Sequence, residues 1–159
     1  MRIKKFGVLA TTVVFAALAL GVAARAGDQH SGTWKMNPAK SMYNPGPPAK
    51  SVTLTIVSDE NGFKVDAEGI GGDGSPTHVE YSAKFDGKDY TITGVPNGDT
   101  VSVKRIDSNT MESTIKAGGQ VMMTVRSTVS KDGKTRTSVF KGKDAQGRDV
   151  NNAVVYDKQ

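Results

Sequence analysis

Four polar side chains fall at positions where the surrounding sequence favours apolar residues. Arg105 follows Val101 and Val103 at a spacing of two, so the three side chains share one face of an extended segment. A buried arginine without a partner is costly, so an inward Arg105 would need a polar ligand. The residues of this class are Arg105, Ser113, Ser127 and Tyr156. We predict that they fix the polar end of a bound ligand; the alternative for Arg105 is a solvated position beyond the rim of its strand.

The sequence lacks the groupings that are typical of an active site. There is no cysteine, which excludes thiol catalysis and cysteine-ligated metal sites. Two S-x-x-K matches, Ser113 to Lys116 and Ser138 to Lys141, lie in predicted strands. Residues three apart in a strand point to opposite faces, so neither lysine could activate its serine. We therefore predict that the protein is not an enzyme and assign no catalytic residue.

The glycine-rich run at 69–74 matches the G-x-G-x-x-G pattern of dinucleotide sites. That pattern requires a helix N-terminus directly after it, whereas Pro76-Thr77-His78-Val79 resumes a strand. We interpret the run as a glycine-rich hairpin. The sequence predicts no cofactor.

Histidine is scarce, with only His30 and His78 in the chain. His78 shares a strand face with Glu80, which would allow metal ligation, but Lys84 on the same face favours a solvated pair. His30 lies in a segment that we expect to be frayed. A second candidate, the oxygen-rich stretch 144–149, lacks the further carboxylates of a calcium loop. We predict no metal site.

Residues 1–26 have the pattern of a secretory signal peptide. A basic start precedes an apolar run from Val8 to Ala24, which ends in the small-x-small sequence Ala24-Arg25-Ala26. The apolar run of about 17 residues is at the short limit for a membrane span, so an uncleaved anchor is the weaker alternative. We predict cleavage after Ala26 and export of a single domain, 27–159, to the periplasm or the medium.

The charge of the predicted mature chain is close to balanced. The full chain has a net charge of +5, but residues 1–26 hold four basic residues and no acidic one. This leaves 17 Lys and Arg against 16 Asp and Glu, spread along the chain. Nucleic acids and anionic membranes attract concentrated positive charge. We therefore expect neither a nucleic-acid partner nor stable membrane insertion.

The elements that must position the polar residues are β-strands. From Ser51 onward, apolar and polar residues alternate, and turn dipeptides such as Asn61-Gly62 and Asp132-Gly133 recur every 10 to 14 residues. The predicted strands are 31–37, 51–60, 62–71, 76–86, 88–94, 99–107, 110–117, 120–130, 134–144 and 149–157. A meander of this length must cover its edges. We predict an all-β fold: an antiparallel up-and-down meander closed into one barrel of about ten strands, without a helical lid.

One segment, 37–50, departs from this alternation. It contains four of the six prolines, which forbid a helix or a central strand. We interpret it as an ordered or semi-ordered connection between the first strand and the meander. A lid over the barrel mouth is the alternative.

The start and end of the barrel resemble a known superfamily. Ser31-Gly32-Thr33-Trp34-Lys35 resembles the G-x-W opening of the calycins, which include lipocalins and fatty-acid-binding proteins. The closing segment 154–158 is similar to the last strand of the fatty-acid-binding branch, although Val154 stands where that branch has an arginine. The chain also resembles small exported bacterial proteins. The resemblance implies that Trp34 packs at the closed end of the barrel, where Gly32 allows close approach of a neighbour.

The predicted barrel favours a binding function. Ten strands enclose more space than the eight-stranded size that side chains just fill, so small inward residues should leave a cavity. We predict binding of a small hydrophobic or amphipathic ligand, with anions preferred to neutral molecules. The main alternative is a structural or inhibitor-like protein-binding envelope protein, with an interior filled by aromatic residues and methionines. An outer-membrane barrel is a further alternative, which the low aromatic content disfavours.

Overall fold

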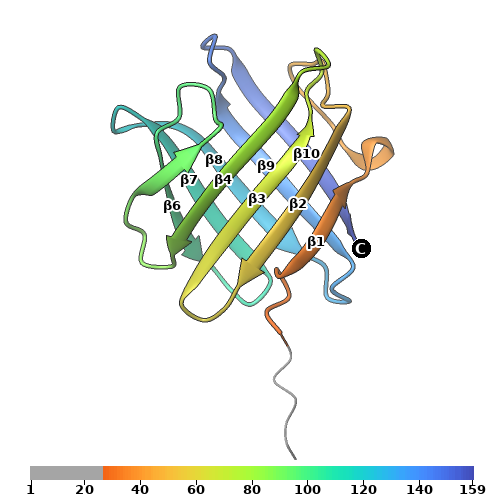
Figure 1. Ribbon diagram of the computed structural model, residues 1–159, viewed down its shortest axis with the longest axis vertical. Helices are drawn as coiled ribbons and strands as arrows, with labels where there is room; N and C mark the ends of the chain where they lie inside the picture. The colour runs from red at the N-terminus through yellow and green to blue at the C-terminus, as the bar shows by residue number, and fades with distance from the viewer. Residues whose placement is uncertain (1–26) are drawn as a thin grey trace, which may run out of the picture.

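The structure, a computed structural model, describes residues 27–159, and the predicted signal peptide lies outside them. Ten antiparallel strands form one closed barrel in which each strand pairs with its neighbours in sequence and β1 pairs with β10 (Figure 1). The strands are β1 (Gly32–Met36), β2 (Ser51–Ser58), β3 (Gly62–Ile70), β4 (Pro76–Lys84), β5 (Tyr90–Thr93), β6 (Thr100–Arg105), β7 (Thr110–Ala117), β8 (Gln120–Val129), β9 (Thr135–Lys143) and β10 (Asp149–Lys158). The prediction of a ten-stranded meander barrel is confirmed, and each strand begins and ends within two residues of its expected bounds.

The turns show why the predicted hairpins form. At two of them, the carboxylate of an aspartate accepts a hydrogen bond from the backbone N–H two residues later in the chain. Lys88 N donates to Asp86 at 3.0 Å, and Lys134 N donates to Asp132 at 3.1 Å. The glycine between each pair, Gly87 or Gly133, has a positive φ near 70°. Aspartate stabilises the turn through its side chain, and glycine supplies a backbone angle that other residues rarely adopt. The Asp-Gly dipeptides therefore fix the ends of the strands locally.

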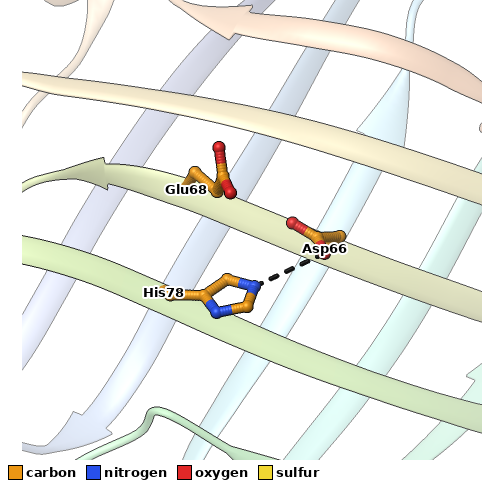
Figure 2. Close-up of side chains that lie close together, drawn as sticks. All are labelled: Asp66, Glu68 and His78. Carbon is orange, nitrogen blue, oxygen red and sulfur yellow. Dashed lines mark hydrogen bonds and ion pairs between the residues drawn. The ribbon is translucent and has the colours of Figure 1, made fainter.

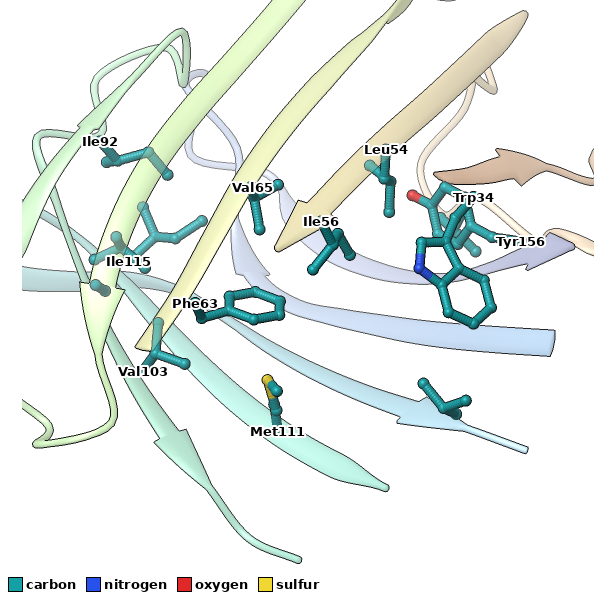
Figure 3. Close-up of a cluster of buried hydrophobic side chains, with 14 of the residues drawn as sticks. Trp34, Leu54, Ile56, Phe63, Val65, Ile92, Val103, Met111, Ile115 and Tyr156 are labelled. Atoms are coloured by element: carbon teal, nitrogen blue, oxygen red, sulfur yellow. The ribbon is translucent and has the colours of Figure 1, made fainter. Parts of the chain in front are cut away.

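The apolar phase of the strands faces the inside of the barrel. Cross-strand pairs on this face include Leu54 with Ala67 and Ile56 with Val65, across β2 and β3. Figure 3 shows such buried side chains from strands all around the barrel converging on one core. The outward phase carries exposed charges, such as Lys64 and Lys84. This alternation gives one hydrophobic interior and one polar wall.

The two ends of the barrel differ. At the lower end in Figure 1, which we call the closed end, the chain enters through residues 27–31. These residues cross beneath the barrel: Ser31 Oγ donates to Ser58 O of β2 at 2.9 Å, and Asn109 Nδ2 after β6 donates to Gln29 Oε1 at 2.8 Å. We call the opposite end, which carries the turns at 71–75 and 94–99, the open end. The N-terminal segment thus covers only one end.

The proline-rich connection lies at the open end and is held by hydrogen bonds. It begins with the single helical element of residues 27–159, the 3-10 turn η1 (Pro38–Lys40). Met42 then pairs with Ala153 of β10, and Lys50 N donates to Ile70 O of β3 at 2.9 Å. The connection is therefore ordered and has no helical lid, as expected. Within the same residues, no helix is long and apolar enough to cross a membrane.

Candidate functional site

A cavity of about 400 Å³ occupies the open half of the barrel interior. Strands β2 to β5 and β7 to β10 line it, with apolar side chains such as Leu54, Val79, Val125 and Phe140. At the open end, the lining includes Tyr43 of the crossing segment 37–50 and residues 94–96 of the turn after β5. Cavities of this size and composition are typical of small-molecule sites. The interior is therefore hollow where it faces the open end.

Gly94 at this rim is required by the geometry. Its φ is +81°, and a Cβ atom there would lie 1.7 Å from the carbonyl oxygen of His78 on β4. A side chain at this position would therefore force β4 and the end of β5 apart. The glycine lets the turn lie close against β4 while leaving the cavity rim open.

Polar side chains gather on the cavity wall where β8, β9 and β10 run together. Arg136 of β9 lies directly opposite Tyr156 of β10, and both line the cavity. Ser138, two residues after Arg136 on β9, lies opposite Ser127 of β8, and the hydroxyl oxygens of the two serines are 2.8 Å apart. The cavity therefore combines apolar walls with a compact polar patch, which we call the polar floor (Arg136, Tyr156, Ser127 and Ser138).

Arg136 is the most unusual member of the polar floor. Its side chain is buried, with 4% exposure, and one terminal nitrogen, Nη1, lies 2.8 Å from His30 Nδ1. Its Nε has no hydrogen-bond partner. Burial lowers the pKa of the guanidinium, but arginine begins from so high a value that it stays charged at neutral pH. None of the ion pairs found within residues 27–159 involves Arg136. Among residues 27–159, no carboxylate forms an ion pair with this buried cation; Asp28, which pairs with Arg105, acts on it only from a longer distance.

His30 supports Arg136 from the closed end. Arginine can only donate hydrogen bonds, so His30 Nδ1 is the acceptor, and the neutral ring carries its hydrogen on Nε2. The ring is fully buried, and burial together with the nearby Arg136 charge lowers its pKa to about 4. The N-terminal segment that contains His30 is therefore ordered, and the expectation that it is frayed was wrong. Two contacts hold His30: its carbonyl accepts from Trp34 Nε1 at 2.9 Å, and its N–H donates to Asp28 Oδ1 at 3.0 Å.

Arg105 lies outside the cavity lining, at the closed end. Its guanidinium forms an ion pair with Asp28, donates to Ser58 Oγ at 3.2 Å, and lies 4.4 Å from the centre of the Phe85 ring. Burial raises the pKa of Asp28, but the hydrogen bonds from His30 N–H and from Arg105 outweigh it, so the pKa is lower than usual. Arg105 therefore lies at the rim of the closed end, as the last residue of β6, but it is ion-paired there and not solvated as the alternative supposed. It joins the N-terminal segment to β6.

The other predicted contacts are divided between the cavity and the core. Tyr156 and Ser127 line the cavity, as members of the polar floor. Ser113 is buried near Tyr81 and does not line the cavity. The predicted set is therefore only partly brought together, and the cation of the site is Arg136 in place of Arg105.

Sequence reasoning missed Arg136, although a signal for it exists. The tight turn at Asp132-Gly133 pairs Val129 with Arg136 and Ser127 with Ser138. Because directly opposite residues of an antiparallel pair share a face, the inward phase of β8 places Arg136 inside. Extending the hairpin register from one strand to the next would have found it. Alternation within β9 could not, because both of its phases mix polar and apolar residues.

Trp34 and Gly32 occupy the closed end, as the resemblance to calycins implied. Trp34 is fully buried, and Lys158 Nζ lies 4.9 Å from the centre of its ring. Gly32 has a φ of +127°, and a Cβ atom there would lie 2.8 Å from Lys158 Cε. Glycine at this position therefore leaves room for the lysine side chain to reach across β1 to the indole.

A separate cluster of charged groups lies on the outer wall. Asp66 and Glu68 of β3 and His78 of β4 bring their ligand atoms within 4.8 Å of one another (Figure 2). His78 Nε2 lies 3.4 Å from Asp66 Oδ2, and both side chains are well exposed. Exposed pairs of this kind are weak because water solvates both partners. The cluster has no connection to the cavity, since none of its three residues is part of the lining.

No protein-family model matches the chain, and no curated protein matches its sequence. The description of the fold therefore depends on the strand order alone: a closed, ten-stranded antiparallel meander barrel, compatible with a calycin-like fold.

Proposed function

We propose that this protein binds a small hydrophobic or amphipathic ligand inside the open half of its barrel. The observation that carries the proposal is the cavity of about 400 Å³, whose walls are mainly apolar and carry the polar floor on one side. Apolar walls gain free energy when a ligand displaces water, and a few polar groups then fix its orientation. The exported location expected from residues 1–26 is part of the proposal.

The placement of large side chains supports this proposal over a filled structural barrel. The inward aromatic residues Phe63 and Phe85 belong to the closed half, where they pack against each other with ring centres 6.3 Å apart. In the open half, small or branched residues such as Ala49, Ala67 and Val79 line the cavity. Two of the aromatic residues that could fill the barrel therefore lie at the end opposite the mouth, whereas Tyr81 and Phe140 form part of the cavity wall.

Calorimetric titration of the purified protein with methyl dodecanoate, dodecanol and dodecanoate tests the proposal. We expect saturable binding at micromolar to sub-millimolar concentration and a one-to-one stoichiometry. Native mass spectrometry of the protein as purified tests whether a ligand is already bound. If no ligand co-purifies and none of the three probes binds below about millimolar, corresponding to about 4 kcal/mol, a structural or protein-binding role replaces the proposal.

A variant that fills the cavity locates the site. Ala67 lines the cavity, so Ala67→Trp should abolish binding of all three probes while leaving the barrel folded. Val121→Trp is the matched control, because Val121 is 63% exposed and absent from the cavity lining. Unchanged binding by a folded Ala67→Trp variant would show that the probes bind elsewhere.

A further inference from the structure

We infer that the ligand carries one anionic group, which binds Arg136 in the polar floor, and that His30 is the positioning residue that holds this arginine in place. The inference rests on the proposed function, because it names the chemical class of the ligand and the residues that would recognise it.

The charge of Arg136 is unbalanced among residues 27–159. A buried cation is normally paired, because removing it from water is costly. Arg105 shows the usual solution within this chain, with Asp28, Ser58 Oγ and a backbone carbonyl around its guanidinium. Arg136 is more deeply buried, yet no ion pair of it is found in the described part of the chain. An anion arriving through the cavity would supply the missing partner.

The arrangement of donors in the polar floor favours an anion. His30 occupies Nη1 of Arg136, whereas Nε is buried and unsatisfied. Carboxylates commonly bind arginine through two parallel N–H groups, so the unpaired Nε offers one half of such a contact. The Tyr156 hydroxyl and the Ser127–Ser138 pair belong to the same floor and could donate to the same anion. The floor thus offers several donors to a group that only accepts.

The net charge of the cavity lining limits the charge of the ligand. Arg136 is the one charged side chain among the residues 27–159 that line the cavity. One cation in an apolar cavity balances one negative charge of a ligand. A second negative charge on the same ligand would be buried without a partner, which is costly. The expected ligand is therefore a monoanion with an apolar tail, such as a medium-chain carboxylate, with its tail directed toward the open end.

The role of His30 is to position Arg136. The imidazole contacts Arg136 through Nδ1 and packs edge-on against the Phe63 ring, with ring centres 6.3 Å apart. The His30 backbone is fixed as well, because its carbonyl accepts from Trp34 Nε1 and its N–H donates to Asp28 Oδ1. A side chain held in this way restricts the guanidinium to one orientation. His30 does not line the cavity, so it would act on the ligand only through Arg136.

The experiment compares dodecanoate with methyl dodecanoate, which has a similar tail and no charge, by calorimetry at neutral pH. For the parent protein we expect dodecanoate to bind about 10- to 100-fold more tightly, as expected for charge-assisted hydrogen bonds. Arg136→Gln should abolish this preference and leave the affinity for the ester unchanged. Arg105→Gln is the matched control at a paired arginine outside the cavity, and it should keep the preference.

His30 is tested in the same assay. His30→Ala should reduce the acid-to-ester preference about 3- to 10-fold, because the guanidinium loses its fixed orientation. His30→Gln should restore part of the preference, since its side-chain oxygen can accept from Arg136. A purely structural role would lower the affinity for both probes equally. A preference unchanged in folded His30→Ala would contradict the positioning role.

The outcomes separate this inference from the proposed function. If the parent protein binds ester and acid equally, or if folded Arg136→Gln keeps the preference, the anion site is wrong while the binding function stands. If neither probe binds the parent, the proposed function fails. Should Arg136→Gln not fold, the ¹⁵N resonance of Arg136 Nε in the parent decides: it should shift with dodecanoate and not with the ester, and no shift with dodecanoate would overturn the inference.

Discussion

The closed half and the open half of this barrel are built from the same strands but are filled differently. In the closed half, Trp34, Val103 and Met111 (Figure 3), together with Val129, are almost completely buried in the core, and none of them lines the cavity. In the open half, branched and small residues surround a cavity of about 400 Å³. The continuous ladder of strands does not distinguish the halves, so the difference arises from side-chain volume.

The same contrast holds for Arg105 and Arg136. Arg105 at the closed end is paired with Asp28, which the N-terminal segment provides. Arg136, on the cavity wall, has His30 and no carboxylate among its hydrogen-bond partners. The segment 27–31 covers the closed end, whereas the connection 37–50 borders the open end through Tyr43 and Ala49 without filling the cavity. The closed half is thus packed and its arginine is paired, whereas the open half contains a cavity and an arginine without an ion pair among residues 27–159.

The strongest test of this contrast is truncation of a large side chain in each half. Trp34→Ala should lower the free energy of unfolding by about 3 to 5 kcal/mol, because the indole is fully buried in a packed region. Phe140 borders an existing cavity, so Phe140→Ala should lower the free energy of unfolding by clearly less, about 1 to 2 kcal/mol. Urea denaturation monitored by circular dichroism measures both. Equal costs would show that the two halves are packed alike.

The next test is the pH dependence of the closed half. The pKa of His30 is about 4 in the folded protein, below its ordinary value of 6.5, and burial is the main cause. Between these values the unfolded chain binds more protons, so stability should fall as the pH decreases from about 6.5 to about 4. The expected loss is about 3 kcal/mol. Unfolding free energies measured at pH 7, 5.5 and 4 test this. His30→Gln should remove the loss, and the same slope in that variant would assign it to other groups.

A smaller effect is expected from the paired arginine. Arg105→Gln leaves the partly buried Asp28 without its cation and should cost about 1 to 3 kcal/mol. The pKa of Asp28 is lowered in the folded state, so the contribution of the pair is present above pH 3.8 and is lost as the pH falls below it. This window lies below that of His30, so acid denaturation can separate the two. A parent-like stability of Arg105→Gln at pH 7 would show that the pair contributes nothing.

The smallest change is expected at the unpaired arginine. Arg136→Met replaces a buried cation with an apolar side chain, so the unliganded protein should be unchanged or more stable by up to about 2 kcal/mol. Thermal and urea denaturation without ligand measure this. A loss of several kcal/mol would show that Arg136 supports the fold as Arg105 does, and the contrast between the arginines would disappear.

The hairpins of the meander were predictable because their signals are local. Asp86-Gly87 and Asp132-Gly133 each fix a turn through contacts within a few residues. The alternation between turns then assigns the faces of β2, β3 and β4. In the polar floor, Tyr156 and Ser127 were predictable from the same alternation, whereas the cation was assigned to Arg105 because its neighbours Val101 and Val103 gave the clearer pattern.

The sequence by itself determined the strands, their turns and their order, because hydrogen-bonded turns and two-residue alternation depend on near neighbours along the chain. Only the tertiary structure decided which arginine is paired and where the interior is empty. Asp28 meets Arg105 across 77 residues, and His30 meets Arg136 across 106. Contacts at such separations exist only after β1 and β10 close the barrel and residues 27–31 cover one end. The volume left inside then depends on all the inward side chains together, which no local pattern records.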